Sequence, residues 1–305
     1  MSHLVTDVKS LELETLKNLK SSKANNTLRA YKSDFRDFAL FCNQNGLNSM
    51  PSEPKIITLY LTHLSKSSKF STLKRRLASI SVIHKLNGHY LDTKQPIITE
   101  NLLGIKRAKG TYQKAKKPIL INDLKLIIKA IDKEKIRDKA IILVGFAGGF
   151  RRSELVNIYF QDIDFVPEGV KILIRRSKTD QSGEGSIKAI PYFENQEFCP
   201  VIALKNYLNK KFSNSDKSQK DVKIFEISDK SVALIIKKYA EKAGLDSSKY
   251  AGHSLRSGFA TTAAEFGAEE RNIMAMTGHK TTQMVRRYIQ EANLFKNNAL
   301  KDIKI

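Results

Sequence analysis

Side chains able to hold a phosphate, move a proton or attack phosphorus gather in three short segments of this 305-residue chain. Arg151 follows an apolar stretch in GGFRRSEL, and His253 and Arg256 stand three residues apart in HSLRSGFAT. His279 and Tyr288 belong to TGHKTTQMVRRYIQ. Arginine forms forked hydrogen bonds with phosphate, histidine transfers protons near neutral pH, and a phenol attacks once it is deprotonated. A tyrosine among cations fits either an ordinary half-buried surface residue or a nucleophile beside a phosphate.

The overall charge favours a polyanionic partner. The chain carries a formal net charge of +22, a sequence pI near 9.8 and 41% hydrophobic residues, enough for a real core. A membrane surface is the competing partner, but no apolar run approaches the roughly 20 residues of a spanning helix. The N-terminus lacks the long apolar core of a secretion signal. We therefore expect a protein of the cytoplasm, in a bacterial-type cell or the host of a mobile element.

The two cysteines, Cys42 and Cys199, are too few for a four-thiolate zinc site, and we interpret both as structural free thiols. Absence of a disulfide framework fits a reducing compartment. His84 and His89 are interpreted as packed or solvated side chains. We expect no metal site.

Charge and periodicity divide the chain. Residues 1–118 hold 21 Lys and Arg against 8 Asp and Glu, so the first third is the denser polycation. Its segments 25–46, 54–64 and 71–88 have helical spacing, which predicts a small helical domain over residues 1–105. In the third segment Leu73, Leu77 and Ile80, with Ile83 or His84, form the apolar stripe. The cations Lys74, Arg75 and Arg76 lie away from it, and we expect them to bind the polyanionic partner.

The segment 106–118 (KRAKGTYQKAKKP) holds six cations and no acid, so we expect an exposed linker. A linker running along a phosphate backbone fits the charge, and a solvated loop is the alternative. The cations of this segment that we expect to bind such a backbone are Lys106, Arg107, Lys109, Lys114, Lys116 and Lys117.

Residues 119–305 form the second predicted domain, mainly helical with a small β-hairpin. Helices are expected within 121–132, 135–150, 199–211 and 231–244. Alternation of Val170, Ile172 and Ile174, a Gly/Ser/Asp-rich turn, and a return arm of Ile187, Ala189 and Pro191 indicate the hairpin. We expect the helix after His253 to open at or just before Ser254, where its N-terminus favours an anion.

In this order, the motifs GGFRRSEL, RRSKTD, HSLRSGFAT and TGHKTTQMVRRYIQ resemble those of the tyrosine recombinases, which include phage integrases and Xer-like and Cre-like enzymes. The resemblance extends over nearly the whole chain. It implies a helical core-binding (SAM-like) bundle, a basic linker and a mostly helical catalytic domain. Nine residues of one helix would put His279 and Tyr288 on opposite faces, so Thr281 or Thr282 is predicted to cap a new helix.

The resemblance also implies roles. Arg151 and Arg256 clamp the scissile phosphate, Tyr288 attacks to form a 3′-phosphotyrosyl bond, and the hairpin residue Lys178 protonates the leaving 5′ oxygen. His253 assists proton transfer at the tyrosine, His279 hydrogen-bonds the phosphate, and Glu154 orients the cations. Because the covalent bond stores the linkage energy, neither ATP nor a metal or other cofactor is required.

Several alternatives stay open. Arg152 competes with Arg151, and Arg175, Arg176 and Lys188 compete with Lys178. The partner implied is double-stranded DNA with paired sites, bound by a dimer per site and a tetramer in synapsis. The C-terminal tail, with Leu294, Phe295, Leu300 and Ile303, docks on the adjacent protomer or packs in cis. Site-specific recombination competes with relaxation of the type IB topoisomerase kind, and with a non-catalytic DNA-binding relative.

Overall fold

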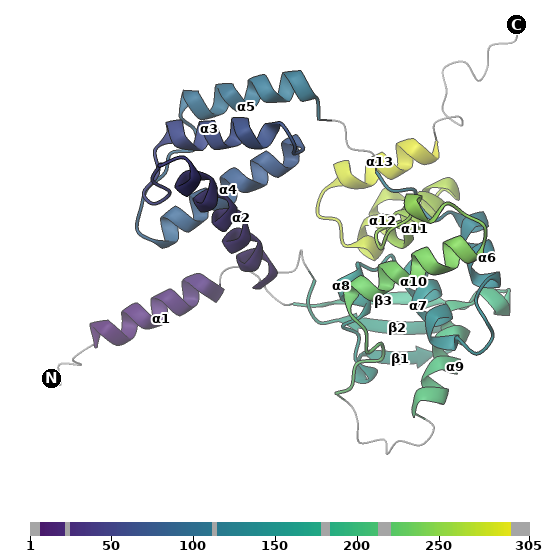
Figure 1. Ribbon diagram of the computed structural model, residues 1–305. Coiled ribbons are helices and arrows are strands. Elements are labelled where there is room, and N and C mark those ends of the chain that lie inside the picture. Colours follow the sequence, from purple (N-terminus) through teal and green to yellow (C-terminus); the bar gives the residue numbers. More distant parts are fainter. Residues whose placement is uncertain (1–6, 22–24, 112–114, 178–183, 213–220, 294–305) are drawn as a thin grey trace, which may run out of the picture. The chain divides into compact units, whose positions relative to one another are not determined.

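The computed structural model describes residues 7–21, 25–111, 115–177, 184–212 and 221–293, in two compact units that divide after Lys114 (Figure 1). Lys114, Lys178 and the predicted tail contacts of residues 294–305 lie outside the described residues. Each unit has a hydrophobic core of its own. None of the described helices is long and apolar enough to cross a membrane.

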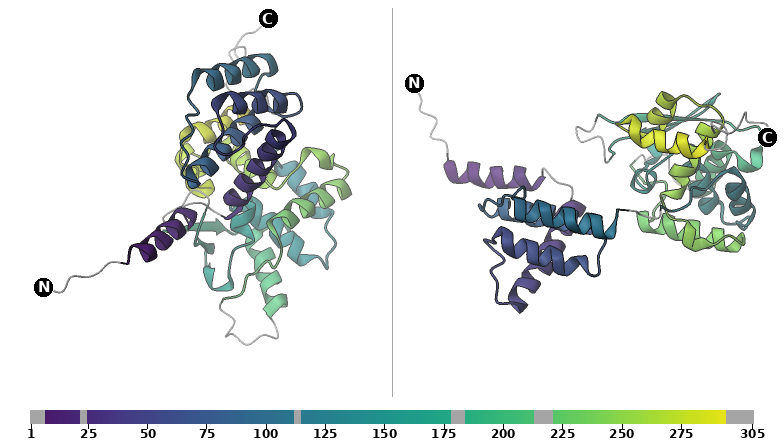
Figure 2. Two further views of the ribbon diagram at one scale, coloured as in Figure 1. Left: turned by 60° about the vertical axis from the view of Figure 1, so that its left-hand side comes forward. Right: turned by 90° about the horizontal axis from the view of Figure 1, so that it is seen from above.

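The first unit is helical, as predicted, and α2 to α5 stay together as one bundle in both views of Figure 2. Its helices are α1 (Val8–Ser21), α2 (Asn25–Gln44), α3 (Pro54–Ser65), α4 (Phe70–Leu86) and α5 (Pro96–Lys109). Pro54 and Pro96 stand in the first turns of α3 and α5, where a missing N–H is harmless.

The apolar stripe of α4 faces this core as the spacing predicts. Leu73, Leu77 and Ile80 are buried, and the stripe continues through His84. His84 Nδ1 is hydrogen-bonded to the Ile80 carbonyl, and its Nε2 accepts from the Ser52 amide. Each ring nitrogen therefore has a protein partner, which confirms that His84 is a packed side chain. Both cysteines are buried and free, as predicted.

The predicted linker begins too early. Helix α5 continues to Lys109, so residues 106–109 are helical. Ile98 is buried in the bundle, with Leu102 and Ile105 packed against the core at helical spacing. Cations in the last turn favour this ending because the helix C-terminus carries partial negative charge. Gly110 then takes a positive φ of 69° and ends the helix.

The second unit contains a three-stranded antiparallel sheet in the order β1-β2-β3, formed by β1 (Ile163–Val166), β2 (Gly169–Ile174) and β3 (Ser186–Pro191). The hairpin is the predicted one, and β1 is an additional strand paired with β2. Val170, Ile172 and Ile174 are buried as expected. On the return arm, however, Lys188 and Ile190 face the core, while Ile187 is 68% exposed.

Helices precede and follow the sheet along the chain. They are α6 (Ile121–Lys129), α7 (Ile136–Ala147), α8 (Arg152–Leu155), α9 (Pro200–Phe212) and α10 (Asp229–Lys242). Short 3₁₀ turns occupy Phe160–Asp162, Gln196–Phe198 and Ser247–Lys249. Helix α7 is buried from Ala140 to Ala147, as its nearly uniform apolar sequence predicts.

The C-terminal layer consists of α11 (Ser254–Glu265), α12 (Glu270–Thr277) and α13 (Thr282–Ala292), which lie side by side in Figure 1. A separate small core of Ala260, Ala264, Ile273 and Val285 holds the three helices together. Tyr288 packs at the edge of this core. The three helices therefore fix the last motif of the chain against α11.

Candidate active site

Arg151 stands at the start of α8, immediately after the glycine turn that ends α7. Its Nη1 donates to Glu154 Oε1 at 2.6 Å, and its backbone N–H donates to Glu154 Oε2 at 2.9 Å. Its Nη2 donates to the Gly278 carbonyl at 3.2 Å. The Arg151 side chain is 18% exposed and that of Glu154 only 3%. Two neighbours thus fix the guanidinium while one edge remains accessible.

Arg256 projects from the first turn of α11 and is only 1% exposed. Its Nη1 donates to the Gly149 carbonyl at 2.9 Å, but no described group accepts from its buried Nη2. Burial and the adjacent Arg151 charge lower the pKa of Arg256, yet it remains a cation at physiological pH. A buried donor without an acceptor is costly, so this nitrogen marks a place for an anionic oxygen.

Tyr288 and His253 meet although 35 residues separate them. His253 Nε2 lies 3.3 Å from the Tyr288 hydroxyl, within hydrogen-bond distance. Burial raises the pKa of Tyr288, although Arg256 and Arg287 oppose the shift, so the phenol is protonated at neutral pH. Partial desolvation and then Arg256 and Arg151 lower the pKa of His253 below 6.5, so its imidazole is neutral there. A neutral imidazole beside a protonated phenol can accept the phenolic proton.

His279 lies against the same tyrosine. It is 6% exposed, and its ring centroid is 6.0 Å from that of Tyr288. Burial, followed by the charge of Arg256, lowers the pKa of His279 to about 4. Thr277 Oγ1 donates to the Ile273 carbonyl and lies 2.8 Å from His279 Nδ1. Because the threonine proton is already engaged, Nδ1 carries the hydrogen, and Nε2 needs a proton before it can donate to a phosphate.

The turn between α12 and α13 brings these two rings together. Gly278 ends α12 in the left-handed conformation, with φ 61°, which glycine adopts without strain. Thr281 then takes the N-cap position of α13, with extended backbone but without a capping hydrogen bond from its side chain. His279 and Tyr288 therefore converge from separate elements, as the threonine pair predicts.

Two of the cations that sequence reasoning offered as alternative catalytic residues, Arg152 and Arg175, lie against carboxylates. Arg152 turns toward Asp229, whose Oδ2 is 3.8 Å from its Nη2, and its side chain packs over Gly252. Arg175 donates to Asp162 at 2.8 Å and lies over the Tyr159 ring. Arg152 nevertheless lies close enough to His253 for its charge to help lower the pKa of that imidazole. Sequence reasoning placed both beside the site, but not the carboxylates that hold them.

Lys188 is the hairpin cation whose position differs most from expectation. It is 5% exposed, and its Nζ lies 3.9 Å from Glu154 Oε2. Burial lowers the pKa of Lys188 to about 8, against the raising effect of Glu154. Lys188 and Arg151 thus share one carboxylate, Glu154, whose charge also acts on Arg256. This cluster of three cations and one acid has a net positive charge that suits a phosphodiester.

The end of the predicted linker is attached to the segment that leads into α11. Lys117 Nζ donates to Asp123 at 2.8 Å and to the Tyr250 hydroxyl at 3.3 Å. Lys116 Nζ donates to the Ser248 carbonyl at 2.6 Å. The Ile119 amide donates to the Ser254 carbonyl at 3.0 Å. These cations therefore hold the approach to His253 as well as being candidates for DNA contact.

Two predicted DNA-binding arginines of the first unit are ion-paired. Asp34, 3% exposed, accepts from Arg75 and from Ser79, and its Oδ1 lies 3.3 Å from Arg76 Nε. Arg76 also contacts Asp37 at 3.1 Å. Both arginines are therefore oriented by acids on α2, a pairing that helical spacing in α4 does not reveal. The predicted cations of this unit that are exposed are Lys74, Arg75, Lys106, Arg107 and Lys109.

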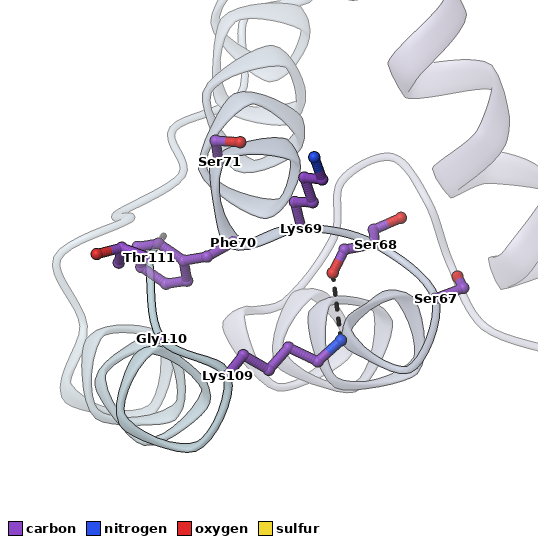
Figure 3. Close-up of a pocket in the computed structure, with 8 residues that line it drawn as sticks. All are labelled: Ser67, Ser68, Lys69, Phe70, Ser71, Lys109, Gly110 and Thr111. Atoms are coloured by element: carbon purple, nitrogen blue, oxygen red, sulfur yellow. Dashed lines mark hydrogen bonds between the residues drawn. The ribbon is translucent and has the colours of Figure 1, made fainter. Parts of the chain in front are cut away.

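A hollow of about 430 Å³ lies between the start of α4 and the end of α5 (Figure 3). It is lined by Ser67, Ser68, Lys69, Phe70, Ser71, Lys109, Gly110 and Thr111. Lys109 Nζ donates to the Ser68 carbonyl at 3.3 Å, and Phe70 points toward Thr111. The hollow belongs to the first unit and contains none of the groups around Tyr288.

Across the described parts of the chain, no three His, Cys, Asp or Glu side chains are grouped to hold a metal ion. The cluster that includes Tyr288 offers donors of hydrogen bonds and protons: the guanidinium groups of Arg151 and Arg256 and the imidazoles of His253 and His279. Such a set can bind a phosphate oxygen and transfer protons.

Comparisons with known proteins identify the family and the fold. A model of the phage integrase family matches residues 119–294. An integrase/recombinase XerD homolog of Selenomonas ruminantium is 43% identical over 303 residues, 95% of this chain and 89% of the relative. A lambda integrase dimer bound to a COC′ core site has a similar fold, with TM-score 0.58, 18% identity, and 97% and 99% of the two chains covered. XerH recombinase in a post-cleavage complex with palindromic difH substrate gives TM-score 0.62, 16% identity, and coverage of 83% and 72%.

Proposed function

This chain belongs to the phage integrase family, and from that premise we propose that it is a site-specific recombinase that cuts and rejoins DNA through Tyr288. One observation carries the assignment of the site. The buried Nη2 of Arg256 has no acceptor among the described groups, and it lies in a cluster that includes Arg151, His253 and Tyr288. A phosphate oxygen of the substrate supplies the missing acceptor.

The guanidinium pair neutralises the scissile phosphate. A phosphodiester resists attack because its negative charge repels nucleophiles. Arg256 is anchored by the Gly149 carbonyl and Arg151 by Glu154, so both are oriented before DNA binds. Preorganised donors stabilise developing charge without further rearrangement. Removing either anchor should therefore weaken the transition state more than it weakens DNA binding.

The cleavage step conserves the number of phosphoester bonds. The Tyr288 oxygen attacks phosphorus in line, a bond from tyrosine to the 3′ phosphate forms, and the bond from phosphorus to the 5′ oxygen breaks. His253 Nε2, at 3.3 Å, takes the phenolic proton. The 5′ oxygen receives a proton from Lys178, a role that rests on the family resemblance. Attack by a 5′ hydroxyl of another duplex reverses these transfers and rejoins the strands.

His279 completes the cluster as a phosphate ligand. Its low pKa keeps it neutral in the free protein, with the hydrogen on Nδ1. Approach of an anionic phosphate raises that pKa because the negative charge stabilises imidazolium. A proton taken up with the substrate then lets Nε2 donate to the phosphate.

The partner is double-stranded DNA, and the solved complexes of similar fold contain a COC′ core site and a difH substrate. We propose that Lys74, Lys106 and Arg107 contact its backbone, with Arg75 and Arg76 oriented by Asp34. Lys109, the last residue of α5, and the linker cations Lys114, Lys116 and Lys117 complete this set. Recombination between paired sites uses a dimer per site and a tetramer in synapsis, assembled through the C-terminal tail.

Covalent trapping tests the proposal. A pool of random-sequence duplexes, incubated with the full chain in EDTA and then denatured, identifies sites that remain attached to protein. A nicked duplex of the selected sequence should then give an adduct that resists denaturation. Tyr288→Phe should remove the adduct, while Tyr192→Phe, which changes a tyrosine 40% exposed after β3, should leave it intact.

The outcomes separate the competing functions. An adduct that requires magnesium, or that survives Tyr288→Phe, refutes the mechanism. Relaxation of supercoiled plasmid without exchange between two sites identifies topoisomerase activity instead. Specific DNA binding with no adduct identifies a non-catalytic relative.

A further inference from the structure

Lys188 is a buried lysine in a position that an apolar side chain would normally occupy. It lies on the core face of β3, 5% exposed, with Nζ 4.5 Å from the centre of the Phe150 ring. Burying an ammonium is expensive unless its protons have acceptors. The acceptors of the Lys188 ammonium indicate its role.

The ammonium joins the ends of two helices. Lys188 Nζ donates to the Gly148 carbonyl at 2.7 Å and to the Met276 carbonyl at 2.5 Å. Gly148 follows the last residue of α7, and Met276 lies in the last turn of α12. Carbonyl groups at helix C-termini lack intrahelical donors and carry partial negative charge. The Lys188 ammonium therefore supplies a hydrogen-bond donor to the C-terminal ends of both α7 and α12.

Each carbonyl lies three residues before a residue of the site. Gly148 precedes Arg151, and Met276 precedes His279. Two arginines of the site also bind these turns. Arg256 donates to the Gly149 carbonyl after α7, and Arg151 donates to the Gly278 carbonyl after α12. The relative position of the two turns thus sets the relative position of Arg151 and His279.

We propose that Lys188 is a positioning residue for strand cleavage, whose ammonium clamps the ends of α7 and α12 so that Arg151 and His279 address the same phosphate. The inference rests on the proposed function, because it gives this clamp a role in that reaction. Glu154, whose Oε2 is 3.9 Å from Nζ, balances the buried charge and holds Arg151 from the other side.

The same contacts argue against Lys188 as the proton donor to the leaving oxygen. Two of its three N–H bonds are directed at carbonyl oxygens, and the nearby Glu154 carboxylate attracts its charge. Delivering a proton to DNA would leave a neutral amine, which holds the two helix-end carbonyl groups less strongly. Lys188 therefore acts through Arg151 and His279, and the proton donor is a different cation.

The clamp has a pH dependence that arginine would not share. Burial lowers the pKa of Lys188 to about 8. The charged and titratable groups facing it are Glu154 on α8, Arg151 before α8, Arg256 on α11 and His279 after α12. Below pH 8 the group is a cation with three donors, and above it the neutral amine holds the two carbonyl groups less strongly. Cleavage should therefore slow above about pH 8.

Single-turnover cleavage of the nicked duplex from pH 6.5 to 9.5 tests the clamp in the full chain. Lys188→Met, which is similar in length but lacks donors, should slow cleavage about 100-fold at pH 7, a size typical of misplaced catalytic groups. Lys188→Arg should stay within about tenfold of wild type at pH 7, and its rate should lack the wild-type decline above pH 8. Lys171→Met, an exposed lysine on the neighbouring strand β2, is the matched control.

Hydrogen exchange supplies a readout that does not depend on cleavage. Peptides covering residues 146–151 and 274–279 should exchange faster in Lys188→Met than in wild type or Lys171→Met. Wild-type exchange and cleavage in a folded Lys188→Met would overturn the inference. If Lys188→Met does not fold, a Lys188→Arg variant that keeps the wild-type decline above pH 8 would overturn it. A wild-type chain that forms no adduct refutes the proposed function instead, and exchange then decides whether the clamp exists.

Discussion

Glu154→Gln tests how far the site depends on a single buried carboxylate. Glu154 accepts from both the backbone and the side chain of Arg151 and lies 3.9 Å from Lys188 Nζ. Glutamine preserves the size of the side chain but replaces one acceptor oxygen with a donor. The substitution therefore removes a hydrogen bond and leaves two cations without their shared negative charge.

The expected loss of stability follows from this geometry. Removing one partner of a buried ion pair costs about 3–5 kcal/mol. Since the Arg151 side chain is 18% exposed and keeps the Gly278 carbonyl as acceptor, the lower value applies, about 3 kcal/mol. That is a factor of about 150 in the folding equilibrium. With a urea slope of about 2 kcal/mol/M, the unfolding midpoint should fall by about 1.5 M.

Urea unfolding followed by far-ultraviolet circular dichroism measures the loss, because the chain has no tryptophan to report by fluorescence. Hydrogen exchange in residues 140–156 assigns the change to the second unit. Glu241→Gln removes an exposed carboxylate on α10 and should shift the midpoint by less than about 0.3 M. If Glu154→Gln behaves like this control, Glu154 does not hold Arg151 in the way described.

Further predictions concern the arginine clamp, a close backbone approach and an imidazole. Arg256→Lys keeps a charge but loses the forked geometry, so single-turnover cleavage should fall about 100-fold. A Cβ at Gly258 would lie 2.0 Å from the Ile119 carbonyl oxygen. In urea titrations Gly258→Ala should therefore lower the free energy of unfolding by about 1–3 kcal/mol. The control Gly104→Ala places its Cβ in open space on α5 and should not lower it. His279 has a folded pKa of about 4 against an ordinary 6.5, so the unfolded chain binds the proton first and the free energy of unfolding should fall as pH drops from 6.5 to 4. His279→Gln should flatten that dependence, and an unchanged slope would contradict the shift.

Local patterns were sufficient for much of the fold. Helical spacing predicts the buried face of α4 because Leu73, Leu77 and Ile80 must lie on one side whatever surrounds them. The turn before α13 is predictable for a similar reason. Gly278 suits a left-handed helix end, and a threonine follows where a new helix has to begin.

The orientation of β3 was not predictable from alternation alone. The segment around Ile187 reads equally well with either face inward, and its apolar residues suggested the wrong one. The core face instead carries Lys188, which is stabilised by carbonyl groups at Gly148 and Met276. Those partners are 40 and 88 residues away in the sequence, so no local pattern can predict them.

Long-range ion pairs likewise escape sequence inspection. Arg75 and Arg76 read as free surface cations of α4, but Asp34 lies more than forty residues earlier on α2 and holds both. The linker boundary fails for a different reason. Charge density suggested an extended segment, whereas the apolar spacing of Ile98 and Ile105 extends α5 into it.

The central claim is that the phenolic oxygen of Tyr288 becomes esterified to DNA. Mass spectrometry of the trapped complex after nuclease and trypsin digestion addresses it directly. Cleavage after Arg287 and Lys296 releases a peptide, residues 288–296, whose one hydroxyl side chain is that of Tyr288. We predict a 3′-linked nucleotide remnant on this peptide. A remnant on any other peptide, or strand exchange by a protein that never carries one, would contradict the account.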